Sequence, residues 1–536
     1  MKITLISLIE DTSIPGLRYL SAYLRAKGHD TNLILLPWSL TDRRLNEHNS
    51  FLYPYPDEVL EQVTKICTDS DLIGISLMTC HFDQAIHVMS FLRKRVQIPI
   101  IWGGIHPTLR PVECLEYADM VCLGEGETSF SELASEMSNG KRWESLSIPG
   151  IRKRDGSQAL STAPGPLIMN LDELPFPDYD LDHQFILYKG SVIKLDSQLL
   201  VKCLGYSYQT LFSRGCPYAC TYCCNNALNK LYGYKLPLRR RSVDNKIKEL
   251  KAAVELMPQL LTINIADDAF LAQSLEDVRD FASRYKKEIG LPFKTLSTPS
   301  SVSISKLEVL IEAGMHSIAV GIQSSSQRIM DLYHRRDSVD ELLAVSARIA
   351  QVAQEKKKFI SPRFDFILDN PWETAEDVEA NIRFCMKLKK PYFLARFSLI
   401  FYPGTELYEK ARAEGIIADD LNQVYRRSQH LPNVNYYNGV FKALCSNTPN
   451  VVISFLLWNP VRRLSPARLP YMIASMSQIG KLFKGFWGFL IRRDWKMIRF
   501  YLLERLSKLR GEKRIIRPMF YGAPGASTKQ AAISEK

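Results

Sequence analysis

Three closely spaced cysteines are the residues of this sequence best suited to chemistry. Cys216, Cys220 and Cys223 have the spacing CxxxCxxC within the segment SRGCPYACTYCC, residues 213–224. Three thiolates on one short loop can bind three irons of a 4Fe-4S cluster and leave the fourth iron without a protein ligand. An iron with an open coordination position implies chemistry rather than storage. The spacing therefore predicts a reactive 4Fe-4S cluster.

Zinc is the main alternative to the cluster, because CxxC pairs commonly bind zinc. A structural zinc site would need a fourth ligand, and no histidine lies between His183 and His316. Cys224 could supply that ligand, although adjacent thiols at positions 223 and 224 would strain a tetrahedral site. We therefore favour the cluster and interpret Cys224 as a packed side chain outside the ligand set.

The cysteine loop follows the first strand of a series of six βα units. Each predicted strand is followed by a helical pattern, and six units suit an open barrel rather than a closed eight-stranded one. In such barrels the chemistry lies where the strands meet the following loops. The sequence thus predicts a partial (βα)6 TIM-like barrel over residues 204–410, with strands at 209–214, 261–266, 293–297, 317–322, 359–367 and 392–401.

Residues 1–140 predict a different α/β domain before the barrel. Short β-branched runs alternate with amphipathic stretches, which is typical of a doubly wound, flavodoxin- or Rossmann-like parallel sheet. Such a sheet binds ligands outside the carboxyl ends of its strands. Those ends carry Gly103, Gly104, Gly124, Glu125 and Gly126. The alternative, that these glycines only permit tight turns, stays open.

Two further segments have weaker patterns. Residues 141–203 carry extended-chain and turn signals and predict a linker packed against both neighbours. Residues 411–536 predict a helical, basic region that caps the barrel and ends in a disordered tail. Within it, residues 461–517 hold 15 Lys or Arg against three Asp or Glu, so the net charge of +12 lies there. Basic amphipathic stretches at 482–491 and 495–509 also suit an anionic membrane surface.

The cysteine pattern and the N-terminus predict a cytoplasmic location, with peripheral contact at the inner membrane surface as an extension. The eleven cysteines are an odd count that does not suit a disulfide framework. The first apolar run is short and lacks a cleavage site, and no run reaches the roughly 20 apolar residues of a spanning helix. No nucleic-acid recognition module is found, so no nucleic acid is expected as a partner.

The cysteine segment, with Tyr222 before the last cysteine, resembles the radical S-adenosylmethionine (radical SAM) superfamily. GGIHPT at 103–108 and VCLGEGE at 121–127 resemble the branch with a cobalamin-binding domain, and LPFPD at 174–178 resembles the segment that joins the two domains there. The resemblance covers about residues 1–410. It implies that S-adenosylmethionine chelates the open iron and is reductively cleaved to a 5′-deoxyadenosyl radical, with cobalamin as a further cofactor.

The resemblance also assigns roles to residues at other strand ends. It implies that Asp267 and Asp268 contact the methionyl amino group, since a carboxylate can accept from an ammonium, and that Gln323 binds the ribose or the methionyl carboxylate. A solvated strand end or a helix N-cap is the alternative for the two aspartates. NPWET at 370–374 and YPGT at 402–405 resemble the turns after the fifth and sixth strands.

Two departures from the family pattern bear on these roles. No histidine lies in residues 10–16, where some cobalamin domains carry the lower axial ligand, so a bound cobalt would lack an imidazole from that loop. Trp372 replaces the usual glycine in the fifth-strand turn. His106 follows a glycine turn, and we interpret it as an ordinary hydrogen-bonding residue rather than a cobalt ligand.

These observations predict a cobalamin-dependent radical SAM enzyme that methylates an unactivated carbon of a small-molecule or lipid-like metabolite. An electron donor such as a flavodoxin or ferredoxin would be its protein partner. A cyclase or rearranging enzyme without methyl transfer is the first alternative. A non-catalytic iron-sulfur or zinc protein is the alternative from a different class.

Overall fold

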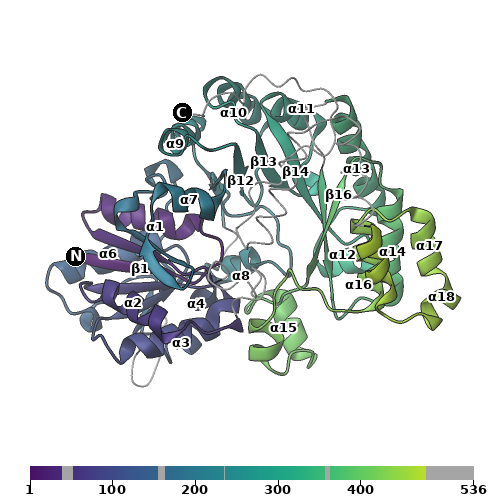
Figure 1. The fold of residues 1–536 in the computed structure, drawn as a ribbon. Coiled ribbons are helices and arrows are strands. Elements are labelled where there is room, and N and C mark those ends of the chain that lie inside the picture. The colour runs from purple at the N-terminus through teal and green to yellow at the C-terminus, as the bar shows by residue number, and fades with distance from the viewer. Residues whose placement is uncertain (39–51, 155–162, 234–235, 357–361, 478–536) are drawn as a thin grey trace.

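The protein folds into two α/β parts that stand side by side, with helices on their outer faces (Figure 1). The computed structural model describes residues 1–38, 52–154, 163–233, 236–356 and 362–477. In that part of the chain one sheet has eight strands and a second has six. The predicted order of a doubly wound sheet, a partial barrel and a helical C-terminal region is confirmed.

The first sheet has the strand order β2-β1-β3-β4-β5 at its centre, and these five strands are parallel. This is the flavodoxin-like order. The direction in which successive strands are added to the sheet reverses between β1 and β3. Ligands bind at such a reversal, outside the carboxyl ends of the strands. The elements are β1 (Lys2–Ser7), α1 (Pro15–Ala26), β2 (Asp30–Leu35), α2 (Asp57–Cys67), β3 (Leu72–Ser76), α3 (Phe82–Arg93), β4 (Ile100–Gly103), α4 (Ile105–Leu109), α5 (Pro111–Cys114), β5 (Met120–Cys122) and α6 (Gly126–Ser138).

The segment expected to be a linker contributes three strands to this sheet. β6 (Ile151–Lys153) pairs antiparallel with β5, β7 (Gln184–Tyr188) pairs parallel with β2, and β8 (Ser191–Lys194) pairs antiparallel with β7. These strands are short, and β8 is largely exposed. Their pairing partners, rather than their own sequence pattern, define them. Helix α7 (Ser197–Leu204) then leads into the barrel.

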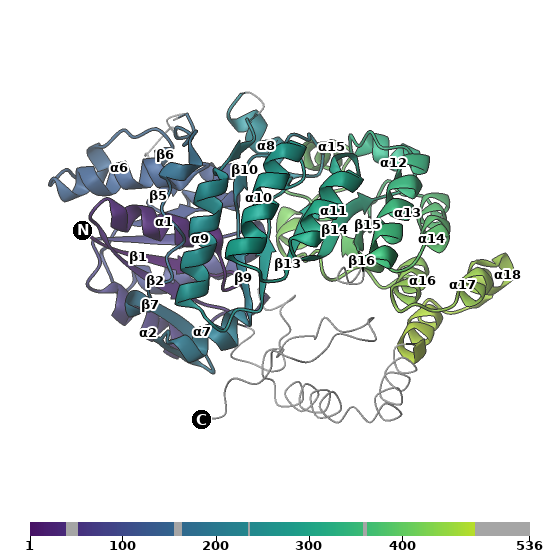
Figure 2. The same cartoon turned by 90° about the horizontal axis from the view of Figure 1, so that it is seen from above.

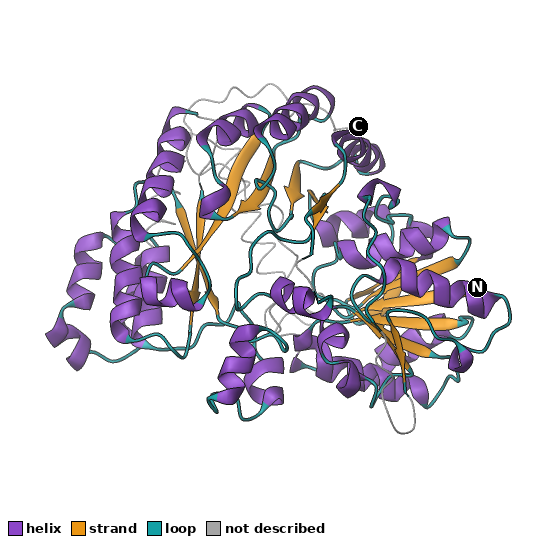
Figure 3. Cartoon of the chain, turned by 180° about the vertical axis from the view of Figure 1, so that it is seen from behind, coloured by secondary structure: helices purple, strands orange, loops and turns teal. Residues whose placement is uncertain are grey.

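The second sheet is parallel with the order β16-β15-β14-β13-β12-β9, so β9 and β16 leave the barrel open. Its helices lie in a row on the outer face (Figures 2 and 3). The strands are β9 (Ser207–Thr210), β12 (Thr262–Ile265), β13 (Phe293–Ser297), β14 (Met315–Gln323), β15 (Arg363–Leu368) and β16 (Phe393–Ser398). The helices are α8 (Cys224–Leu231), α9 (Val243–Leu256), α10 (Leu275–Glu288), α11 (Ile304–Glu312), α12 (Gln327–Leu332), α13 (Val339–Glu355), α14 (Ala375–Lys387) and α15 (Glu406–Ala413).

The described part of the C-terminal region is helical. Helix α16 (Tyr436–Cys445) packs against α14 and β16, and α17 (Asn450–Leu457) and α18 (Asn459–Leu464) continue from it to the edge of the molecule (Figure 2). Among the described residues no helix is long and apolar enough to cross a bilayer. The amphipathic stretches at 482–491 and 495–509 and the tail at 523–536 lie outside the described residues.

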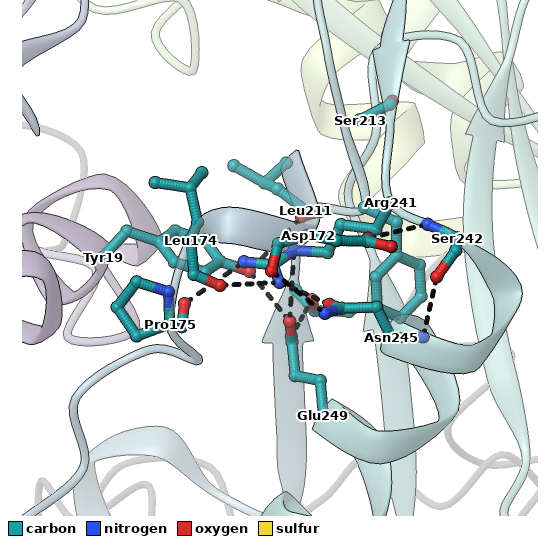
Figure 4. A network of polar contacts seen from close by, with 12 residues as sticks. Tyr19, Asp172, Leu174, Pro175, Leu211, Ser213, Arg241, Ser242, Asn245 and Glu249 are labelled. Atoms are coloured by element: carbon teal, nitrogen blue, oxygen red, sulfur yellow. Dashed lines mark hydrogen bonds and ion pairs between the residues drawn. The ribbon is translucent and has the colours of Figure 1, made fainter. Parts of the chain in front are cut away.

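A buried polar network joins the two parts (Figure 4). Glu249 on α9 accepts from the hydroxyls of Tyr19 on α1 and Tyr208 on β9, each at 3.1 Å. Its side chain is fully buried and lies 3.7 Å from the guanidinium of Arg241. Arg241 in turn donates to the carbonyl of Leu174 in the joining segment at 3.1 Å. The network therefore fixes the orientation of the first domain relative to the barrel.

Candidate functional site

The three cysteines of the motif lie on one loop at the carboxyl end of the barrel sheet. The loop runs from β10 (Ser213–Arg214) to α8, and Cys223 is the N-cap residue of that helix. All three thiols are partly exposed. Burial, with Cys223 and Cys220 nearby, raises the pKa of Cys216 to about 11. Without a metal the thiol forms are therefore favoured, and iron binding would have to displace their protons.

The donor set fits a cubane cluster. The thiols of Cys216, Cys220 and Cys223 are close enough to influence one another electrostatically. Among the described residues no three His, Cys, Asp or Glu side chains converge as they would around one metal ion. A cubane does not require such convergence, because each thiolate binds a different iron. Cys224, the first residue of α8, contacts the side chain of Cys223.

Backbone hydrogen bonds hold this loop at both ends. At its start, the carboxylate of Asp267 accepts from the amides of Phe212 at 2.6 Å and Ser213 at 3.3 Å. At its end, the amide of Thr221 donates to the carbonyl of Tyr333 at 3.3 Å, and the Thr221 hydroxyl donates to the carbonyl of Leu332 at 2.8 Å. The loop geometry is thus set by the strand and helix ends around it.

The two aspartates after β12 differ in their surroundings. Asp267 is buried, and its carboxylate accepts hydrogen bonds from the backbone amides of the cluster loop. Burial raises its pKa to about 6. Asp268 is exposed, and its carboxylate accepts from the Asn225 side chain at 2.9 Å. Asp268 is therefore the carboxylate of this pair that can reach a ligand.

Gln323 ends β14 in a conformation that few non-glycine residues adopt. Its φ angle is 69°. A Cβ atom at Gly321 would lie 2.5 Å from Nε2, the side-chain amide nitrogen of Gln323. The side chain therefore folds back over the strand end, where the neighbouring Gly321 leaves room for it. Backbone strain of this kind costs about 1–3 kcal/mol and clusters at ligand sites.

Arg335 is a site residue that the sequence reasoning missed. It is 8% exposed, donates to the carbonyl of Gly321 at 2.7 Å, and its Nε has no partner among the described residues. Its guanidinium also lies beside Tyr222 and Cys220, and one of its Nη atoms is 3.6 Å from the carboxylate of Asp337. A buried cation thus stands between the cluster loop and the end of β14. In the sequence it belongs to the run HRRD, which has the pattern of a solvated surface segment.

A cavity of about 440 Å³ opens at the carboxyl ends of β1, β3, β4 and β5. All five residues predicted to hold a ligand in the first domain line it. A Cβ atom at Gly104 would lie 2.6 Å from the Leu77 carbonyl, so the backbone approaches closely there. The cavity wall is completed from the barrel by Leu211 and Arg214. The predicted residues on the wall are Gly103, Gly104, Gly124, Glu125 and Gly126.

Two residues discussed from the sequence lie away from this cavity. His106 is fully buried between the rings of Phe82 and Tyr425, and burial together with Arg110 lowers its pKa to about 3. It is neutral and does not line the cavity. Trp372 packs against Phe401 and donates to Glu414 at 2.6 Å, so it fills the junction between the barrel and α15.

Two family profiles match separate parts of the chain. The profile of the B12 binding domain matches residues 1–134, and that of the radical SAM superfamily matches residues 210–385. An uncharacterized methyltransferase of Pyrococcus horikoshii is 28% identical over 75% of this chain and 79% of its own. The anaerobic magnesium-protoporphyrin IX monomethyl ester cyclase of Synechocystis is 28% identical over 39% of this chain and 37% of its own.

The fold also has a counterpart among solved structures. The radical S-adenosylmethionine methyltransferase TsrM from Kitasatospora setae, solved with cobalamin and a 4Fe-4S cluster bound, superposes with a TM-score of 0.59. The match covers 77% of this chain and 78% of TsrM at 15% identity. At that identity the match concerns the fold alone.

Proposed function

The chain belongs to the radical SAM superfamily, in the branch with an N-terminal B12-binding domain, and from this premise we propose that it methylates an unactivated carbon of a small-molecule or lipid-like substrate. The observation that carries the proposal is the shared wall of the two cofactor sites. Arg214 lines the cavity of the first domain and lies two residues before Cys216. A corrin in that cavity and a cluster on that loop would therefore face one another.

The proposed roles follow from the contacts of each residue. Cys216, Cys220 and Cys223 bind the cluster, and the glycine-lined cavity holds cobalamin. When bound, these cofactors supply radical initiation from S-adenosylmethionine and a transferable methyl group. Asp268 accepts from the methionyl ammonium, and Gln323 bonds to the ribose or carboxylate. Asp267, for which the family resemblance implies the same role, also accepts from the backbone amides of the cluster loop and holds that loop in place.

Arg335 adds a partner for the carboxylate of S-adenosylmethionine. Its guanidinium is buried beside the cluster loop and keeps an unpaired Nε. A buried cation with an unused donor favours an anionic ligand, and guanidinium groups match carboxylates geometrically. Arg335 would thus orient the methionyl carboxylate toward the open iron.

Anaerobic reconstitution tests the proposed reaction. The protein would be loaded with iron, sulfide and cobalamin, supplied with S-adenosylmethionine, a reductant and candidate substrates, and analysed by chromatography. We expect both 5′-deoxyadenosine and S-adenosylhomocysteine from the wild type and from Cys224→Ala, and neither from the triple variant with Cys216, Cys220 and Cys223 changed to Ala. Deoxyadenosine without S-adenosylhomocysteine would favour the cyclase alternative. A fully clustered wild type that never cleaves S-adenosylmethionine would contradict the enzyme assignment.

Electron delivery requires a partner with a low potential, and a flavodoxin or ferredoxin fits that need. Cleavage of S-adenosylmethionine takes one electron per event, and those two classes carry single electrons. Reduction of the clustered protein by a purified flavodoxin, followed by the signal of the reduced cluster in electron paramagnetic resonance, would test this partner. Absence of any reduction with either class would contradict it.

Contact with an anionic membrane is proposed for α17, α18 and the residues after them. We call residues 450–477 the C-terminal arm. Six large apolar side chains are exposed within 26 positions of this arm, and Arg463 and Arg468 are exposed among them. Apolar side chains with interleaved cations suit a lipid surface that carries negative charge. The six apolar residues are Val451, Phe455, Trp458, Leu464, Met472 and Met476.

Vesicle sedimentation distinguishes this contact from a simple cap. We expect the protein to pellet with phosphatidylcholine vesicles that contain phosphatidylglycerol, and less with phosphatidylcholine alone. The double variant Phe455→Ser, Trp458→Ser should lose binding, whereas Leu256→Ser, a change at an exposed leucine on α9, should retain it. Equal sedimentation of all three proteins would contradict a role for the arm.

A further inference from the structure

Four charged side chains join the loop after β5 to the strands that flank the cluster loop. Glu125 is the last residue of this loop and the N-cap of α6, Glu127 lies in the first turn of α6, and Arg214 and Arg239 lie on β10 and β11 (Arg239–Arg240). Arg214 Nη1 donates to Glu125 at 3.0 Å and to Glu127 at 3.2 Å. Arg239 Nη1 donates to Glu125 at 3.0 Å. We call these four residues the charge latch.

One end of the charge latch is tied to the first cluster cysteine. Arg214 and Arg239 are opposite one another in the β10–β11 pair, and only Gly215 separates Arg214 from Cys216. Gly215 has a φ angle of 89°, and a Cβ atom there would lie 2.6 Å from the carbonyl of Pro237. The backbone between the latch and Cys216 is thus confined, so a displacement of Arg214 must displace Cys216.

The other end is tied to the cavity of the first domain. Glu125 and Glu127 line that cavity together with Gly124. Gly124 also lies under Tyr232 at the end of α8, so close that a Cβ atom would come within 2.3 Å of the tyrosine hydroxyl. The loop after β5 therefore contacts the cluster segment at two points, through the charge latch and through Tyr232.

The charge balance of the latch makes it a stiff connection. Its two carboxylates and two guanidinium groups cancel, and the Glu127 and Arg239 side chains are only 5% and 3% exposed. Arg239 and Arg214 hold the pKa of Glu125 below its ordinary value against the opposing effect of burial. Separating such a pair leaves an uncompensated buried charge, which is strongly unfavourable. The two loops should therefore move together.

We propose that the charge latch couples cobalamin binding in the cavity to iron loading of the cluster loop. Iron bound to Cys216 would restrict the position of Arg214, and Arg214 would in turn restrict Glu125 and Glu127. Cobalamin would then bind with a smaller loss of conformational entropy, because this wall of the cavity is already ordered. By linkage, bound cobalamin must favour the loaded cluster by the same factor. This inference rests on the proposed function, because it takes the cavity to be the cobalamin site.

Equilibrium binding of hydroxocobalamin to the full-length protein, with and without its reconstituted cluster, tests the coupling. We expect the wild type to bind at least about fivefold more tightly with the cluster, which is the low end of common coupling factors. Arg239→Gln should bring this ratio close to one. Arg239 does not line the cavity, so the change removes no wall of the cobalamin site.

A matched control is an ion pair that joins the first domain to the C-terminal side without touching the cluster loop. Asp83 on α3 accepts from Arg426 at 2.6 Å, and Asp83→Asn should keep the wild-type ratio. Equal affinities in the two states of the wild type, or an unchanged ratio in Arg239→Gln, would overturn the coupling and leave the proposed function standing. No cobalamin binding in either state would overturn the proposed function itself.

A spectroscopic measurement covers the case in which Arg239→Gln does not fold. The electron paramagnetic resonance spectrum of the reduced wild-type cluster should change when cobalamin is added. Ordering of the cavity wall would restrict Arg214 and, through it, the position of the Cys216 ligand. The same addition should leave the spectrum of Arg239→Lys unchanged, because a lysine keeps the charge but not the forked contact with Glu125, and position 239 does not line the cavity. Identical wild-type spectra with and without bound cobalamin would overturn the proposal.

Discussion

Arg335 is the single residue whose position adds most to the proposed site. It is buried between the cluster loop and the end of β14, with one guanidinium nitrogen unpaired. A charge-assisted hydrogen bond contributes about 1.5–3 kcal/mol, so its loss corresponds to about a 10- to 150-fold weaker affinity. We predict that Arg335→Gln weakens S-adenosylmethionine binding to the clustered protein by this amount in equilibrium dialysis.

The neighbouring arginine provides the control for that measurement. Arg336 is exposed, and Arg336→Gln should bind S-adenosylmethionine as the wild type does. Iron content and the visible spectrum establish that each variant carries its cluster. If Arg335→Gln binds S-adenosylmethionine with wild-type affinity, the guanidinium contacts the cluster loop and the end of β14 but does not bind the ligand.

Glu373, in the turn after β15, should make stability depend on pH. Burial, with Asp377 and Asp369 nearby, raises the pKa of Glu373 from its ordinary 4.5 to about 8. Between these values the folded state holds a proton that the unfolded state has lost, so the free energy of unfolding falls as pH rises. The slope is about 1.4 kcal/mol per pH unit, and it ends near pH 8.

We predict that Glu373→Gln removes this dependence and is more stable than the wild type at pH 8.5. Anaerobic urea unfolding at pH 6 and pH 8.5 measures the difference. Glu376→Gln, a change at an exposed carboxylate three residues away, should keep the wild-type slope. A wild-type slope in Glu373→Gln would place the titrating group elsewhere.

Among the structural elements, helix α16 depends on a single carboxylate at the end of β15. Asp369 has a φ angle of 62° and accepts from Ser398 at 2.7 Å, from the Asn433 amide at 2.8 Å and from the Asn438 side chain at 2.6 Å. These bonds tie the start of α16 to the barrel mouth. Asp369→Ala would break all three and leave alanine in a left-handed conformation that it rarely adopts.

We predict that Asp369→Ala raises amide hydrogen exchange across residues 433–445, equivalent to a loss of about 2–3 kcal/mol in local stability. Asp369→Asn should have a smaller effect, because asparagine accepts hydrogen bonds and tolerates positive φ. Exchange in α10, at the other side of the barrel, should not change. Wild-type exchange in α16 of the alanine variant would show that the helix is held by its apolar packing.

The elements that sequence reasoning located well are those with strong local patterns. The predicted strand at 293–297 coincides with β13, because this short alternating segment is bounded by the turn residues Gly290 and Pro299. Strands β7 and β8 were missed, since a short edge strand is defined by the neighbour it pairs with. Arg335 and Arg239 were missed for a related reason: an arginine in a basic run indicates a surface until the fold buries it.

At the scale of the whole molecule, the relative position of the two cofactor sites depends on contacts that no local pattern contains. Three sets of contacts join the first domain to the barrel and the segment after it. They are the Glu249 network, the charge latch, and the hydrogen bond that Tyr425, in the π-helical turn η8 (Leu421–Tyr425), donates to Glu113 at 2.6 Å. Because these contacts involve separate elements, together they restrain rotation as well as separation.

We predict that Glu249→Ala uncouples the two parts. The change leaves the Arg241 side chain, which is 1% exposed, without its carboxylate, and breaking a buried ion pair costs about 3–5 kcal/mol. Calorimetry of the wild type should give one transition, and the variant should give two, with the first domain unfolding at the lower temperature. Glu249→Gln keeps one oxygen that can accept from either Tyr19 or Tyr208, so its behaviour should fall between those of the wild type and Glu249→Ala. A single wild-type transition in Glu249→Ala would mean that the charge latch and the contact at Tyr425 suffice to join the domains, and that the buried network serves only the local packing of α9.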